Sequence, residues 1–207
     1  NPLVKHCWEI ADYTRCGMIL PTMGTNGQFA SCSNLGSLPV KNYTTNLFPT
    51  AQKFNGDSLR EYYKGKPKPC YACRFAHCQE IEIKSGPHKG EIVEEPEFEP
   101  LTAFSSQIGN PEDVDGAVWL AALNDRPGMD AKVQAFVLGL AIECYEKGLI
   151  TKEDTGGIEM TWGNLVSVEK MLHKIARREG FGDILAEGVM RAAQKIGGEA
   201  PNFAVYT

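Results

Sequence analysis

The amino-acid sequence predicts a mainly α fold: a multihelical domain with a small β-hairpin and a cysteine-rich cluster loop. Apolar residues recur at helical spacing through the second half of the chain, and two short alternating segments flank a turn near its middle. Three cysteines fall within residues 70–78, just before that hairpin. With 207 residues and 43% apolar content, the chain is long enough to bury a substantial core.

The chain begins with a helix signal and continues into a long polar segment. Asn1-Pro2 starts a pattern in which Leu3, Val4, Cys7 and Trp8 recur at helical spacing, and we expect this helix to end near residues 16–17. Residues 21–49 are rich in Gly, Asn, Ser and Thr, which predicts an ordered loop. A loop of that length is usually functional or packed against another element.

A short helix and a hairpin surround the cysteines. Asp57-Ser58 starts a helix that runs to Tyr63, and residues 64–69 then lead into the cysteines. After them, Glu80–Ile83 and Gly90–Val93 alternate in polarity on either side of a Gly- and Pro-containing turn. This pattern predicts a hairpin.

From Glu97 onward the pattern is helical. A helix over 131–147 is predicted by an apolar stripe and by Asp130 as its N-cap, with Gly148 as its stop. A second stripe predicts a helix from residue 165 to Gly180. We expect Asp183 to cap a third, continuous helix that carries the apolar residues Leu185, Val189, Ala192 and Ile196.

Charge and apolar run lengths exclude two classes of partner. The formal net charge is −5, which gives no positive field for nucleic acid. The longest apolar stretches, Val118–Leu123 and Ala135–Ile142, fall short of the roughly 20 residues that a membrane span needs. Seven cysteines, an odd number, and the absence of a secretory signal at the start predict reduced thiols and a cytoplasmic location.

The three clustered cysteines, Cys70, Cys73 and Cys78, have the spacing of a metal site. Thiolates two to four residues apart on a short loop can converge on one iron or zinc centre, because the metal offsets the cost of ordering the loop. Spacing alone leaves open an iron–sulfur cluster, a zinc site or ordinary thiols. A fourth ligand is needed, and the candidates are Cys7, Cys16, Cys32, Cys144 and His77.

Several motifs in a fixed order resemble the tungsten-dependent aldehyde:ferredoxin oxidoreductase family. The likeness covers most of the chain. It rests on the loop from Gly24 to Asn42, the cysteine cluster, and five later segments: Pro96–Glu99, Asp125–Asp130, Glu146–Ile150, Trp162–Asn164 and Arg178–Gly188. The resemblance implies that residues 1–207 are a single helical domain, similar to the middle domain of these enzymes, with a loop-rich cluster-bearing part (1–96) and a helical part (97–207).

The same resemblance implies cofactors and a reaction. Cys70, Cys73 and Cys78 are expected to bind three irons of a [4Fe–4S] cluster beside a tungsten bis-pterin cofactor, within an enzyme that oxidises aldehydes. The family spacing is C-x2-C-x3-C, whereas Cys78 here follows four residues. This departure fits a divergent branch such as the tungsten subunits that reduce benzoyl-CoA. A stand-alone zinc or iron–sulfur module is the alternative from another class. We expect the chain to be a fragment or one subunit, inactive alone.

By resemblance, Asp125, Gly128 and Asp130 contact the pterin. A carboxylate can accept the paired N–H donors of an aminopyrimidine, and a glycine lets a ring approach the backbone. The structural alternative is that Asp130 is the N-cap of the following helix and that Pro127-Gly128 is a plain turn.

By resemblance, Glu99 lies beside the metal centre as a general acid or base, provided that burial raises its pKa. Glu97 is the alternative residue in the alignment, and the structural alternative is that these carboxylates belong to a solvated acidic face.

Expected partners are the remaining domains or subunits of the enzyme, a second copy in a homodimer, and ferredoxin. Lys64, Lys66 and Lys68 form either a ferredoxin-docking surface or a solvated basic loop.

Overall fold

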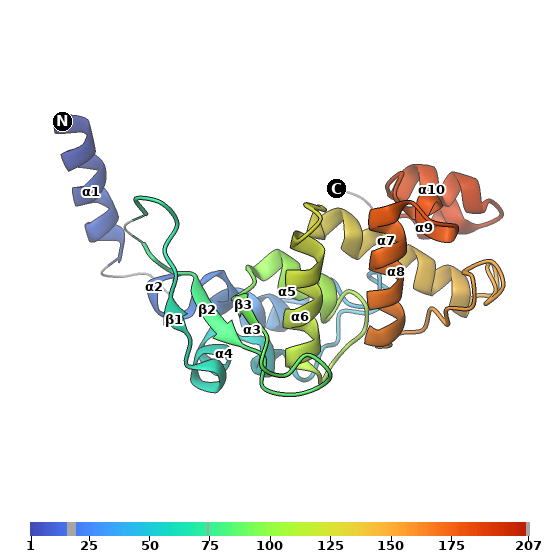
Figure 1. Cartoon of the computed structure of the whole chain (residues 1–207), viewed down its shortest axis with the longest axis horizontal. Coiled ribbons are helices and arrows are strands. Elements are labelled where there is room, and N and C mark those ends of the chain that lie inside the picture. The colour runs from blue at the N-terminus through green and yellow to red at the C-terminus, as the bar shows by residue number, and fades with distance from the viewer. Residues whose placement is uncertain (16–19, 74, 206–207) are drawn as a thin grey trace.

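The computed structural model describes residues 1–15, 20–73 and 75–205 and confirms a mainly α fold with a small sheet (Figure 1). Its helices are α1 (Pro2–Arg15), α2 (Leu20–Met23), α3 (Phe29–Asn34), α4 (Gly56–Tyr63), α5 (Phe98–Phe104), α6 (Val114–Asp125), α7 (Ala131–Glu146), α8 (Leu165–Arg177), α9 (Phe181–Leu185) and α10 (Val189–Ile196). Short 3-10 helices are η1 (Thr25–Gln28), η2 (Ala51–Phe54) and η3 (Ala200–Phe203). Among these residues no helix combines the length and apolarity needed to cross a bilayer.

The predicted hairpin is confirmed, and a third strand joins it. Strands β1 (Lys66–Pro67), β2 (Gln79–Glu82) and β3 (Ile92–Glu94) form an antiparallel sheet in the order β1-β2-β3, with Ile81 opposite Val93. The sequence did not indicate β1, because a two-residue strand that ends in proline carries no alternation to detect. The connection from β1 to β2 is the cysteine loop, which extends away from the body of the molecule (Figure 1).

The core is built around α7, and α5, α6 and α10 pack against it. The predicted helix is present, but it is buried on nearly all sides from Gln134 to Cys144 rather than along one stripe. The apolar residue Val133, in the first turn of this helix, is instead 42% exposed. Asp130 caps the helix as predicted, because its Oδ1 accepts the amide of Val133 at 2.8 Å.

The segment predicted as one long loop is partly helical. Residues 20–34 form α2, η1 and α3, and Phe29 of α3 is fully buried against Phe54, with ring centroids 5.5 Å apart. The polar composition hid these helices because each is only four to six residues long. The first helix ends at Arg15, and Cys16 lies outside the described residues.

The third predicted helix is wrong in detail, because it is two helices. Gly188, with φ 84°, separates α9 from α10. Asp183 is not an N-cap but lies in the first turn of α9, where its Oδ1 is 2.9 Å from Nε of Arg178. A Cβ at Gly182 would lie 2.3 Å from the carbonyl carbon of Lys174, so α9 packs directly on the backbone of α8.

Candidate metal and cofactor site

The cysteine loop is closed at its base by the backbone. The amide of Lys68 donates to the carbonyl of Cys78 at 2.9 Å, and the amide of Cys73 donates to the carbonyl of Cys70 at 3.0 Å. Cys70 is exposed, Cys73 is half-buried and Cys78 is buried. The three predicted ligands are therefore presented by one closed loop, with Cys78 at its inner end.

Cys78 lies against a histidine and a carboxylate. Its Sγ is 3.5 Å from Nε2 of His77 and 3.5 Å from Oε1 of Glu97, and the last two atoms are 2.8 Å apart. The hydroxyl of Thr25 donates to the other oxygen of Glu97. Glu97 follows the cysteines by 19 residues, and β3 and the N-terminal end of α5 bring it back to them.

The pKa values of Cys78 and Glu97 are shifted in opposite directions. Burial, reinforced by the Glu97 carboxylate, raises the pKa of the Cys78 thiol to about 12. Burial would also raise the pKa of Glu97, but hydrogen bonds from Thr25 and His77 outweigh it and hold that pKa below its usual range. A cation at this position would therefore meet a carboxylate that is already ionised.

A buried ion pair lies next to His77. Nη2 of Arg60 is 3.2 Å from Oε2 of Glu95, and both side chains are largely buried. The same guanidinium donates to the carbonyl of His77. Burial raises the pKa of Glu95 despite the attraction of Arg60. Helix α4 is thereby tied to the inner end of the cysteine loop.

The described candidates for a fourth ligand differ sharply in position. Cys144 is fully buried in the core on α7, Cys32 is half-buried on α3, and Cys7 is exposed on α1. Cys16 lies outside the described residues. Of the candidates that the structure describes, only His77 is adjacent to a cysteine of the cluster.

Asp125 shares a hollow with Lys68, a residue at the base of the cysteine loop. It ends α6 and lines a hollow of about 340 Å³ together with Lys68, Glu94 and Arg126. Desolvation in this hollow raises the pKa of Asp125, although a hydrogen bond with Asn124 opposes it. Because Lys68 also closes the cysteine loop through its amide, the hollow and the loop share a wall.

Gly128 and Asp130 lie further along the same turn. The amide of Gly128 donates to the carbonyl of Asp125 at 2.9 Å, and its φ of 74° explains the glycine without any ligand. Asp130 caps α7, so its structural role is confirmed, and it lines a separate hollow of about 560 Å³ that includes Glu187 and Met190. Their contact with a pterin stays a prediction.

Glu99 and Glu97 lie in different pockets. Glu99 is exposed in the first turn of α5 and lines a pocket of about 210 Å³ with Tyr43, Lys132 and Phe136. The described residues do not provide the burial on which its acid–base role depends. Glu97, the alternative, lies with Cys78 instead.

Lys64, Lys66 and Lys68 are exposed along the approach to the cysteine loop. Lys68 also forms an ion pair with Glu94, with 3.1 Å between Nζ and Oε2. Exposed lysines at this position fit both a ferredoxin-docking surface and a solvated basic loop.

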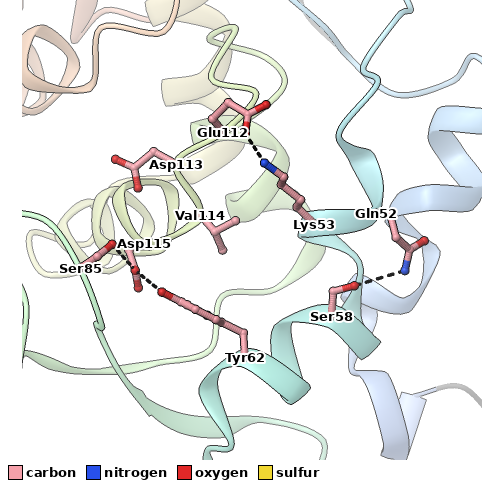
Figure 2. A pocket seen from close by; sticks show the side chains of 9 residues that line it. All are labelled: Gln52, Lys53, Ser58, Tyr62, Ser85, Glu112, Asp113, Val114 and Asp115. Atoms are coloured by element: carbon pink, nitrogen blue, oxygen red, sulfur yellow. Dashed lines mark hydrogen bonds and ion pairs between the residues drawn. The ribbon is translucent and has the colours of Figure 1, made fainter.

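A pocket that the sequence did not indicate surrounds Asp115, the second residue of α6 (Figure 2). It has a volume of about 450 Å³. The Asp115 carboxylate is 3% exposed and accepts four hydrogen bonds, from Tyr62 at 2.9 Å, Tyr63 at 2.8 Å, the Lys84 amide at 3.0 Å and Ser85 at 2.6 Å. With its acceptor capacity used, this carboxylate joins α4, α6 and the hairpin and acts structurally.

A helical domain that presents thiols on a closed loop beside a cofactor-sized hollow has the character of a redox metalloprotein domain. Within that class, the chain belongs to the aldehyde ferredoxin oxidoreductase family: the family model described as "Aldehyde ferredoxin oxidoreductase, domains 2 & 3" matches residues 6–207. The resemblance seen in the sequence is thereby confirmed.

Relatives and one solved structure agree with this assignment. The chain is 36% identical over 182 residues to the tungsten-containing aldehyde ferredoxin oxidoreductase of Pyrococcus horikoshii, covering 86% of this chain and 29% of that protein. It is 40% identical over 129 residues to the aliphatic sulfonate oxidoreductase, WOR-like subunit, of Pyrococcus furiosus, covering 61% of this chain and 20% of that protein. The active site complex BamBC of benzoyl coenzyme A reductase, in complex with 1,5 dienoyl-CoA, superposes with a TM-score of 0.60 at 26% identity, covering 75% of this chain and 22% of that one. The chain therefore spans under a third of the length of these proteins.

Proposed function

We propose that this chain is the cluster- and pterin-contacting domain of a tungsten- or molybdenum-pterin oxidoreductase that oxidises aldehydes to carboxylic acids and passes the electrons through a [4Fe–4S] cluster to ferredoxin. Membership of the oxidoreductase family supports the reaction class. The observation that carries the proposal is the shared wall between the cysteine loop and the Asp125 hollow, formed by Lys68. It would place an electron carrier next to a cofactor.

The donor set fits an iron–sulfur cluster. Cys70, Cys73 and Cys78 offer three soft thiol ligands on one closed loop, and cysteine thiolates are the usual ligands of [4Fe–4S] clusters. The fourth would come from another part of the enzyme. Asp125 lines the neighbouring hollow and offers a carboxylate that could accept hydrogen bonds from the N–H groups of a pterin.

Oxidation of an aldehyde by water gives the acid, two protons and two electrons. When bound, the tungsten–pterin group supplies the two-electron acceptor and the cluster passes the electrons on singly. The chain's own part in this reaction is proton handling and orientation. Glu99 is exposed on this chain, so its proposed role as the base that takes a proton from the attacking water requires that another part of the enzyme covers its pocket; Lys132, which lines the same pocket, would attract the developing carboxylate.

The assembled enzyme that contains this domain provides the test, with an aldehyde as substrate and a viologen dye as electron acceptor. We expect Glu99→Gln to lower kcat about 100-fold, the scale of general acid–base catalysis. Glu82→Gln removes an equal charge from an exposed site on β2 and should leave kcat unchanged. Equal rates for wild type and Glu99→Gln, with the cluster signal intact in both, would exclude Glu99 from catalysis.

A second candidate is reduction of an aromatic thioester ring, favoured by the superposition on BamBC. A ring-reducing enzyme would use the same cysteine loop but would need a much longer substrate channel. Assay of the assembled enzyme with an aldehyde and with a cyclic dienoyl-CoA separates the two. Turnover of the thioester alone would replace aldehyde oxidation as the function.

A further inference from the structure

Residues 41–43 form a left-handed turn in which none of the three residues is glycine. The backbone φ angles are 45° at Lys41, 53° at Asn42 and 62° at Tyr43. Asparagine tolerates this region, but lysine and tyrosine are uncommon there because the Cβ atom lies close to the following carbonyl oxygen. Strained backbone of this kind persists only where the surrounding structure enforces it, and it is concentrated at functional sites.

The core beneath the turn holds it in place. The amide of Asn42 donates to the carbonyl of Gln107 at 3.2 Å. The Asn42 side chain is buried, and its Nδ2 donates to Oε2 of Glu143 at 2.7 Å and to the carbonyl of Phe203 at 2.8 Å. Because Asn42 is anchored by these contacts, the position of the adjacent Tyr43 is fixed as well.

Tyr43 stays at the surface although the turn constrains it. The residue is 50% exposed. Its ring lies over the ring of Phe136, with centroids 6.4 Å apart and planes inclined by 21°. Burial of Tyr43 therefore does not explain the strained turn, and the exposed part of its ring is available for stacking with a ligand.

Tyr43 lines the pocket of about 210 Å³ that also contains Glu99. The apolar residues around this pocket are Pro39, Tyr43, Phe98, Ala103, Ala135 and Phe136. An apolar cavity of about 150 Å³ binds benzene, so this pocket has room for one aromatic ring that carries a carbonyl group. A mostly apolar wall with a few charged groups, here Glu99 and Lys132, is typical of a site for a small organic molecule.

We propose that Tyr43 is a specificity-determining residue that stacks on the aromatic ring of an aryl aldehyde. This inference rests on the proposed function, because it takes the Glu99 pocket as the place where the aldehyde is oxidised. Contact between two rings favours an aromatic substrate over a saturated one of the same size. The reaction keeps its balance: the aryl aldehyde and water give the aryl acid, two protons and two electrons.

Two aldehydes of nearly equal size test the inference in the assembled enzyme, because benzaldehyde is aromatic and cyclohexanecarbaldehyde is not. We expect the ratio of their kcat/KM values to fall about fivefold in Tyr43→Ala and to stay unchanged in Tyr43→Phe, which keeps the ring. Tyr62→Ala is the matched control, since Tyr62 is similarly exposed but lines the Asp115 pocket. If both aldehydes are oxidised and Tyr43→Ala leaves the ratio unchanged, the inference is overturned and the proposed function stands.

Binding of benzoate, the product acid, gives a measurement that does not depend on turnover. Isothermal titration calorimetry of the assembled enzyme should show that Tyr43→Ala weakens benzoate binding about fivefold and cyclohexanecarboxylate binding less. If no aldehyde is oxidised, the proposed function fails, and benzoate binding alone decides whether Tyr43 binds the ring. Equal benzoate affinity in wild type and Tyr43→Ala would then overturn the inference too. Tyr43→Gly, which suits a φ of 62°, replaces Tyr43→Ala if the alanine variant does not assemble.

Discussion

Replacement of Asp115 by alanine should destabilise the chain by about 3 kcal/mol. The carboxylate accepts four hydrogen bonds, of which Figure 2 shows those from Tyr62 and Ser85. The donors on Tyr62 and Ser85 are on exposed residues and can turn to water after the change. The Tyr63 side chain is buried and Lys84 is half-buried, so neither donor can turn freely to water. A donor that loses its acceptor away from water costs about 1–3 kcal/mol, and the two losses, less the recovered cost of burying the carboxylate, give the stated figure.

Urea unfolding followed by circular dichroism measures this change. Tyr62→Phe is the control, because it removes one exposed donor and should cost under about 1 kcal/mol. A loss below about 1 kcal/mol for Asp115→Ala, or equal losses for the two variants, would refute the reasoning.

The pH dependence gives an independent check. Burial would raise the pKa of Asp115, but the hydrogen bonds from Ser85, Lys84 and the two tyrosines outweigh it and hold the pKa below its ordinary value of 3.8. A carboxyl with a depressed folded-state pKa contributes stability that is complete above its unfolded pKa and is lost as the pH falls through the folded value. Asp115→Asn should therefore approach the stability of wild type only below about pH 3.8. A constant difference from pH 7 to pH 2 would contradict this.

Two further predictions concern reactivity and packing. In the metal-free chain iodoacetamide should label the exposed Cys70 well before Cys78. Burial raises the pKa of the Cys78 thiol from 9.0 to about 12, which lowers its thiolate fraction about 1000-fold. Equal labelling of the two cysteines, measured by peptide mapping, would contradict the burial of Cys78. Gly182→Ala should cost about 1–3 kcal/mol in urea unfolding, because its Cβ would meet the carbonyl of Lys174 at 2.3 Å. The Cβ of Gly128→Ala would enter open space, so this variant should lose only the about 1 kcal/mol that a φ of 74° costs an alanine. A larger loss of stability for Gly128→Ala than for Gly182→Ala would contradict the argument.

Local patterns predicted the parts of the fold that local chemistry determines. The helix after Asp130 and the hairpin at residues 80–93 follow from capping, periodicity and turn residues, and the structure confirms them. The break at Gly188 and the direct packing of Gly182 depend on how two helices meet, which no local pattern records. The helices of residues 20–34 were hidden because they are shorter than the window in which periodicity becomes visible.

The candidate site shows the same division. Spacing along the chain was enough to predict that Cys70, Cys73 and Cys78 share a loop. It could not show that Glu97 returns to Cys78 or that Asn26 lies beside His77 and Cys78, because both depend on tertiary contacts across 19 and 51 or more residues. The sequence placed Gly24–Gly27 only within a loop, and the glycines of this segment were the signal that another part of the chain approaches its backbone closely.

Metal analysis of the full chain tests the central claim most directly. Iron, zinc and acid-labile sulfide are measured after anaerobic reconstitution with iron and sulfide, for wild type and Cys70→Ser side by side. The proposed role in electron transfer predicts iron together with sulfide in wild type and loss of both in Cys70→Ser. Zinc without sulfide in wild type, or equal iron and sulfide in the two proteins, would contradict a cluster on this loop.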